Sequence, residues 1–135
     1  MIEGINHIAV VVPDLENALP FWRDALGLPL AGMDSVPSEG VDTAFLPVGN
    51  SNIELIKPTV ADSGVARFLE KRGPGIHHIC LEVDDIAATM QHLRNLDIPL
   101  INEEPQVGHG NRLYAFVHPK GTGGVLVELY QMPTT

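Results

Sequence analysis

An internal repeat constrains the fold of this chain more than any other feature of its sequence. Residues 4–15 and 75–86 align without a gap at an offset of 71, and six of the twelve aligned positions are identical. The same offset carries Ala44-Phe45 onto Ala115-Phe116, and an offset of 74 carries 53–55 onto 127–129. Matches at both ends of each half, in the same order, indicate two copies of one structural module.

Each copy has the pattern of a strand, a helix and then three strands. Helices are expected from the Asp14 cap to Leu26, with a kink or a late start at Pro20, and from the Asp85 cap to Asn95. Strands are expected over 5–12, 41–48, 51–56, 76–83, 113–118 and 125–130. The sequence thus predicts an α+β fold in which two βαβββ modules form one curved sheet cup with helices outside. We expect a single domain over 1–135, with module 1 at about 4–57, a linker and short helix at 58–74, and module 2 at about 75–131.

Composition narrows the class of protein. The formal net charge of −9 argues against nucleic acids and anionic membranes as partners, because both need clustered cations. The longest apolar run, Ile8–Val12, is too short to span a bilayer, and the first residues show no secretory signal. The single cysteine, Cys80, excludes an internal disulfide and fits a reducing compartment. These features predict a cytoplasmic protein.

The repeat superimposes two histidines and two glutamates. It pairs His7 with His78 and Glu54 with Glu128. Both glutamates interrupt apolar strands, where an ionised carboxylate is unfavourable unless a cation or dense hydrogen bonding meets it. Two neutral imidazoles and two carboxylates balance a divalent metal ion, and such a set suits Zn, Co, Ni, Mn or Fe(II). The pattern predicts one shared metal site. By strand alternation His77 faces the other side of the sheet, where we expect a helix contact.

Longer motifs carry a family resemblance along almost the whole chain. They are Gly4-Ile5-Asn6-His7-Ile8, Ile53-Glu54-Leu55-Ile56-Lys57-Pro58, Gly75-Ile76-His77-His78-Ile79 and the stretch from His118-Pro119-Lys120 to Glu128-Leu129. This sequence resembles the vicinal oxygen chelate superfamily and, within it, the methylmalonyl-CoA epimerases. The resemblance implies His7, Glu54, His78 and Glu128 as ligands of one divalent metal, Co²⁺ first and Zn²⁺, Mn²⁺, Ni²⁺ or Fe²⁺ as alternatives. It also implies an acyl-CoA substrate and a homodimer.

The resemblance further implies a reaction. The (R) and (S) forms of methylmalonyl-CoA would interconvert by α-proton abstraction through a metal-stabilised enediolate. Inversion needs an acid/base on each face of the substrate, and Glu128 would serve one face. The family usually has its other carboxylate in the loop before Gly40-Val41. Ser38 stands at that position here and Glu39 follows it. We predict Glu39 as the second catalytic residue, with a water held by Ser38 as the alternative.

Four residues are predicted to bind the substrate. Ser38 lies beside Glu39, and the repeat offset of 71 places His109 opposite Ser38. Arg112 and Lys120 are candidate cations for the phosphates of CoA, as are Lys57, Arg67 and Arg72.

Three other functions remain open at this point. A lactoylglutathione lyase uses the same ligand scheme, an extradiol-type dioxygenase needs only two histidines and one carboxylate, and a ligand-binding resistance protein of this fold generally lacks the metal set.

Overall fold

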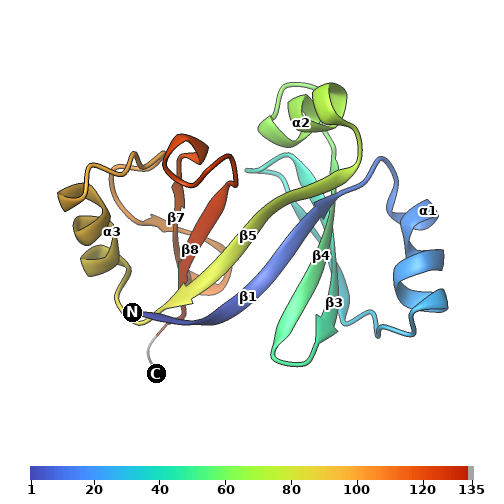
Figure 1. The fold of residues 1–135 in the computed structure, drawn as a ribbon. Coiled ribbons are helices and arrows are strands. Elements are labelled where there is room, and N and C mark those ends of the chain that lie inside the picture. The colour runs from blue at the N-terminus through green and yellow to red at the C-terminus, as the bar shows by residue number, and fades with distance from the viewer. Residues whose placement is uncertain (134–135) are drawn as a thin grey trace. The chain divides into compact units, whose positions relative to one another are not determined.

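A computed structural model describes residues 1–133 and contains two βαβββ modules in chain order (Figure 1). The first module consists of β1 (Ile2–Val11), α1 (Leu15–Leu19), β2 (Gly32–Val36), β3 (Val41–Val48) and β4 (Ser51–Pro58). A connecting helix, α2 (Gly64–Arg72), follows. The second module consists of β5 (Gly75–Val83), α3 (Ile86–Asn95), β6 (Gln106–Val107), β7 (Leu113–Val117) and β8 (Val127–Gln131). The predicted α+β class and the order of elements in each module are confirmed.

The chain divides into two compact units whose boundaries fall within strands. One unit is His7–His77, and the other joins Met1–Asn6 to the residues from His78 onward. The strands β1 and β5 therefore each contribute residues to both units. Within residues 1–133, no helix is long and apolar enough to cross a bilayer.

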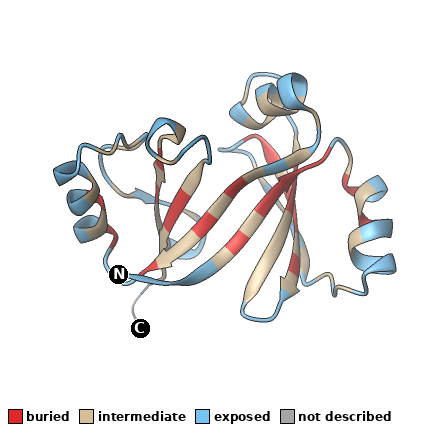
Figure 2. Cartoon of the chain, viewed as in Figure 1, coloured by how far each residue is buried: buried red, intermediate tan, exposed pale blue. Residues whose placement is uncertain are grey.

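In the unit His7–His77, the strands lie in the order β2-β3-β4-β1, with β1 parallel to β4 and the other pairs antiparallel. Helix α1 packs on one face of this sheet, and its buried core is Val10, Val12, Leu15, Leu19, Ala44, Leu46 and Leu55. Helix α2 packs on the opposite face against Ala9, Val11 and Ile56. Figure 2 shows buried segments along β1 and β4, as expected for a sheet with a helix on each side.

The first helix ends sooner than the sequence predicts. Asp14 caps it as expected, because its carboxylate accepts a hydrogen bond from the Glu16 N–H at 2.8 Å. The α-helical hydrogen bonding stops at Leu19, and Pro20–Ala25 forms a π-helical segment. Proline has no N–H to donate, so the regular ladder cannot continue through Pro20. The predicted irregularity at Pro20 is thus confirmed, and it takes the form of a wider helical turn.

The other unit has the strand order β5-β8-β7-β6, with β5 parallel to β8. Its core joins α3 to the sheet through Val83, Ile86, Met90, Ala115, Val117 and Leu129. Strand β8 starts at Val127, two residues later than predicted. Val125 belongs to the preceding turn instead, because its N–H donates to Oγ1 of Thr122 and its carbonyl accepts from that hydroxyl.

Strand register confirms that the two modules superimpose as the repeat predicts. Phe45 lies opposite Glu54 in the first module, and the repeat-related Phe116 lies opposite Glu128 in the second. On the other side of each glutamate, Ala9 is the partner of Glu54 and Cys80 the partner of Glu128. Each glutamate therefore occupies the same position in its own module.

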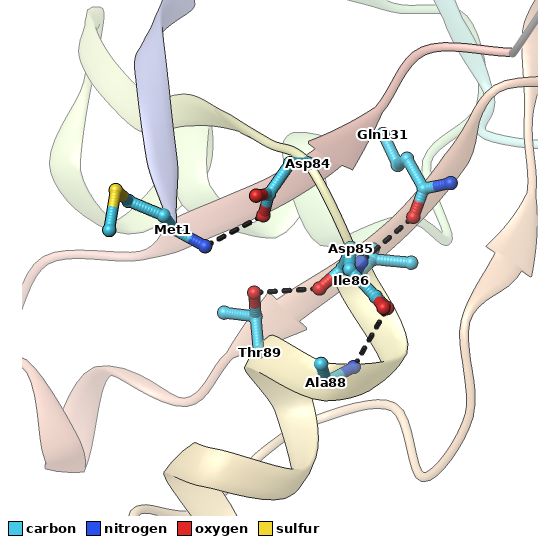
Figure 3. Close-up of polar contacts among 7 residues, drawn as sticks. All are labelled: Met1, Asp84, Asp85, Ile86, Ala88, Thr89 and Gln131. Atoms are coloured by element: carbon cyan, nitrogen blue, oxygen red, sulfur yellow. Dashed lines mark hydrogen bonds and ion pairs between the residues drawn. The ribbon is translucent and has the colours of Figure 1, made fainter.

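The N-terminus of α3 has two side-chain acceptors (Figure 3). The Asp85 carboxylate accepts from the Ala88 N–H at 3.0 Å, as predicted for a cap, and Oε1 of Gln131 accepts from the Ile86 N–H at 2.8 Å. The second contact ties the helix to β8, so the helix start is fixed both locally and by the sheet.

Removing the Asp85 cap should destabilise the protein without affecting its chemistry. Asp85→Ala is expected to lower the free energy of unfolding by about 1 kcal/mol, because the Ala88 N–H loses its acceptor. Asp85→Ser retains an acceptor and should lose much less. Urea denaturation of both variants measures the difference. An Asp85→Ala protein as stable as the parent, or an equal loss in Asp85→Ser, would contradict this role.

Candidate metal ligands and active site

The first His–Glu pair lies within the unit His7–His77. Nδ1 of His7 on β1 is 3.0 Å from Oε2 of Glu54 on β4. The parallel register sets Ala9 beside Glu54, and the period of two puts His7 on the same face of the sheet as both. The His7 side chain is 6% exposed and that of Glu54 17%, so the pair is largely withdrawn from water.

The second pair repeats this arrangement in the other unit. Nε2 of His78 on β5 is 3.0 Å from Oε1 of Glu128 on β8, and both side chains are almost fully buried. Phe116 packs edge-on against the His78 ring, with 5.5 Å between the ring centroids. The aromatic contact restricts the orientation of the imidazole beside the carboxylate.

Each pair has donor chemistry that fits a divalent metal. Each brings one imidazole nitrogen and one carboxylate oxygen, the ligands that borderline cations prefer. Two donors bound to one ion at about 2.1 Å and at right angles are roughly 3.0 Å apart, which is the separation in both pairs. Without an ion, the same separation suits a ring N–H that donates to the carboxylate.

Cys80 adds a soft donor to the second pair. It is fully buried, and its sulfur lies within 4.8 Å of a carboxylate oxygen of Glu128. It shares a face of β5 with His78, whereas His77 faces the other way and packs edge-on against Phe68 of α2 at 5.1 Å. The predicted helix contact of His77 is therefore confirmed.

The structure places Ser38 and Glu39 at the exposed tip of the turn from Pro37 to Gly40, between β2 and β3. The backbone of the turn is held by the Thr59 N–H, which donates to the Gly40 carbonyl at 2.7 Å. Gly40 has a φ of +66°, and a Cβ there would lie 2.7 Å from Cγ2 of Val60. Any other residue would be strained at this φ and would push against the Val60 side chain, so the turn that carries Glu39 favours glycine at position 40.

A groove of about 380 Å³ lies next to this turn, between the end of β4 and α2. Its lining is mainly apolar and includes Pro58, Val60 and Leu69, with Glu70 as its one charged side chain. A carboxylate repels phosphates, so the groove does not suit the nucleotide end of a CoA ester.

Arg112 follows the exposed turn that carries His109, and it lies against an aromatic ring. Its guanidinium carbon is 5.7 Å from the centroid of the Tyr130 ring. Burial raises the pKa of the Tyr130 phenol above its ordinary value, and the neighbouring Arg112 partly opposes this. Tyr130 lies two residues after Glu128 on β8, so both side chains share a face of the sheet.

Lys120 is exposed in the short turn Pro119–Gly121. Its backbone N–H donates to Nδ1 of His118 at 3.1 Å, so the histidine of the His-Pro-Lys motif caps this turn. A Cβ at Gly121 would lie 2.9 Å from Ile98 and Pro99. The motif therefore shapes a tightly packed turn that presents the lysine to solvent.

Sequence reasoning missed Thr43 and Tyr130. Thr43 is one of four buried polar or charged residues among 1–133, with His7, His78 and Glu128. Side chains two residues apart on a strand share a face. Thr43 lies two residues before Phe45, the partner of Glu54, and Tyr130 lies two residues after Glu128, so this rule would have found both.

Comparison with known proteins identifies the class. The chain belongs to the Glyoxalase/Bleomycin resistance protein/Dioxygenase superfamily, whose profile matches residues 6–116. The resemblance to methylmalonyl-CoA epimerases is also confirmed. The chain is 42% identical to the mitochondrial methylmalonyl-CoA epimerase of Mus musculus over 128 residues, which cover 94% of this chain and 72% of that protein.

Two further similarities extend over nearly the whole chain. The ethylmalonyl-CoA/methylmalonyl-CoA epimerase of Cereibacter sphaeroides is 40% identical over 134 residues, covering 98% of this chain and 100% of that protein. A solved methylmalonyl-CoA epimerase in complex with methylmalonyl-CoA and NH4+ superimposes with a TM-score of 0.92 at 30% identity, covering 99% of this chain and 97% of that one.

Proposed function

We propose that this protein is an epimerase that interconverts the (R) and (S) forms of methylmalonyl-CoA. The observation that carries the proposal is the duplicated His–Glu pair, 3.0 Å apart in each module, in a chain that matches such epimerases almost end to end. The whole chain, 1–135, acts as one domain, in the cytoplasm and as a homodimer. The lone Cys80 supports a reducing compartment.

The proposed ligands of one divalent metal are His7, Glu54, His78 and Glu128. Two neutral histidines and two carboxylates cancel the charge of the ion, which removes the penalty of burying the glutamates. When bound, the ion supplies Lewis-acid stabilisation of the negative charge that develops on the thioester and carboxylate oxygens. Cobalt is the metal that the family resemblance favours, with zinc, manganese, nickel and iron as alternatives.

Proton transfer is assigned to two carboxylates. Glu128 removes or returns the α-proton on one face of the substrate, and Glu39 does so on the other, because inversion requires delivery to the face opposite removal. Ser38 and His109 bind the reacting end of the substrate. Arg112 and Lys120 offer cations to the phosphates of CoA, and the exposure of Lys120 supports this assignment.

The direct test follows α-proton exchange by NMR in D2O. Metal-loaded protein should exchange the α-proton of methylmalonyl-CoA and convert a single epimer to the mixture, and chelated protein should not. The same preparation should leave the glutathione hemithioacetal of methylglyoxal unchanged. Turnover of the hemithioacetal without thioester exchange would favour the runner-up, a lactoylglutathione lyase.

Metal stoichiometry tests the shared site. The parent protein should bind one divalent ion per chain, because all four ligands serve one ion. His7→Ala and His78→Ala should each lower the affinity by at least about 10-fold, since each removes a direct ligand. Elemental analysis and titration with Co²⁺ measure both. Two ions per chain, each lost with one histidine only, would show separate sites.

The two proposed acid/base residues should respond differently to removal of their charge. Glu39→Gln should lower epimerisation on the order of 100-fold, with metal content unchanged, because only a general acid/base is lost. Glu128→Gln should lose both metal affinity and activity, because it removes a ligand and a base together. Unaltered turnover in Glu39→Gln with a large loss in Ser38→Ala would transfer the role to Ser38 and a water it holds.

A further inference from the structure

Thr43 is the one buried polar residue of the described chain that the proposed chemistry leaves without a role. Among residues 1–133, the others are His7, His78 and Glu128, all proposed metal ligands. Thr43 lies in the middle of β3 and is 4% exposed. A hydroxyl group that is buried to this extent normally has a hydrogen-bond partner.

The Thr43 hydroxyl makes no hydrogen bond with any described residue. It is also not sealed inside the protein, because every fully enclosed side-chain nitrogen or oxygen in residues 1–133 has a partner. Its oxygen therefore opens onto space at the surface of the sheet. An otherwise buried side chain with a single unpaired polar atom facing open space is suited to bind a ligand.

The register places this hydroxyl beside the first His–Glu pair. Phe45 is the partner of Glu54, and Thr43, two residues earlier, is the partner of Ile56. Because side chains alternate along a strand, Thr43 and Glu54 lie on the same face. Diagonal neighbours of this kind in an antiparallel pair are about 7–8 Å apart.

Long side chains at such diagonal positions can reach the same small group, so a ligand held beside Glu54 also lies within range of the Thr43 side chain. From ordinary bond lengths, a malonyl group is roughly 5 Å across. A substrate anchored at a metal beside Glu54 would thus reach the Thr43 hydroxyl. The repeat-related residue in the other module is Tyr114, which also carries a hydroxyl. Tyr114 pairs with Tyr130 on β8, as Thr43 pairs with Ile56 on β4.

We infer that the Thr43 hydroxyl donates a hydrogen bond to the free carboxylate of the malonyl-CoA-type substrate and selects for that carboxylate. This rests on the proposed function and adds a residue to it. If the substrate chelates through its thioester oxygen and one carboxylate oxygen, the second carboxylate oxygen needs a donor. A hydroxyl suits this task and cannot act as a base near neutral pH, so the contact is one of binding and orientation.

The test compares Thr43→Val, which has nearly the same shape without the hydroxyl, with Thr43→Ser, which keeps it. Thr43→Val should lower kcat/KM for methylmalonyl-CoA by about 10- to 100-fold and weaken calorimetric binding of malonyl-CoA similarly, because a hydrogen bond to a charged group is lost. Thr43→Ser should stay within about 5-fold of the parent. Metal content should be unchanged in both variants.

Thermal stability separates this role from a structural one. Because the hydroxyl is unpaired in the protein, Thr43→Val should melt at the same temperature as the parent or higher. A lower melting temperature, or activity within about 3-fold of the parent, would overturn the inference. A parent protein that neither turns over methylmalonyl-CoA nor binds malonyl-CoA would overturn the proposed function together with it. An active parent beside an equally active Thr43→Val would overturn the Thr43 assignment alone.

Discussion

The burial of two carboxylates in apolar strands is the constraint on which the rest of the structure depends. Glu54 and Glu128 each lie against a histidine at 3.0 Å, on the face of the sheet that does not carry α1 or α3. The next residues, Leu55 and Leu129, face the opposite side and pack in the helix-covered cores. A slip of one residue would bury a carboxylate in the helix-covered core and place a leucine beside the histidine. The pairing register of β4 and β8 is therefore fixed by the His–Glu contact on one face and by the leucine core on the other.

The same feature explains why the four residues of the two His–Glu pairs could be selected from the sequence. His7, His78, Glu54 and Glu128 are visible because a charged residue breaks an apolar strand twice, at related positions. Thr43 carries no such signal, since a single threonine is ordinary in a strand and its repeat partner is a tyrosine. Thr43 stands out because its side chain is buried and its hydroxyl has no hydrogen-bond partner among the described residues. Both are properties of the tertiary structure. The strands β2 and β6 could not be located either, because such short strands leave little periodicity to read. For α1, the sequence indicated an irregularity at Pro20 but not that the α-helix ends at Leu19.

The two carboxylates proposed for proton transfer have contrasting environments. Glu128 is 8% exposed and lies beside His78, whereas Glu39 is exposed at the tip of a turn. Next to Glu39, the Gly40 carbonyl accepts a hydrogen bond from the Thr59 N–H and Gly40 packs on Val60, which ties the turn to the residues after β4. The pair thus provides two acid/base groups without requiring a symmetric site.

The proposed substrate requires the two modules to differ near their His–Glu pairs. Its two chelating groups differ, one being a thioester and the other a free carboxylate, whereas the duplicated modules present the same His–Glu pair. The difference must therefore come from the neighbours of the ligands. At equivalent positions the modules carry Ala9 and Cys80, and Thr43 and Tyr114. Each module keeps its His–Glu pair, whereas these flanking positions differ between the two copies. Under the proposed function, that divergence, with a small hydroxyl in one module and an aromatic ring in the other, allows a repeated scaffold to distinguish the two ends of its substrate.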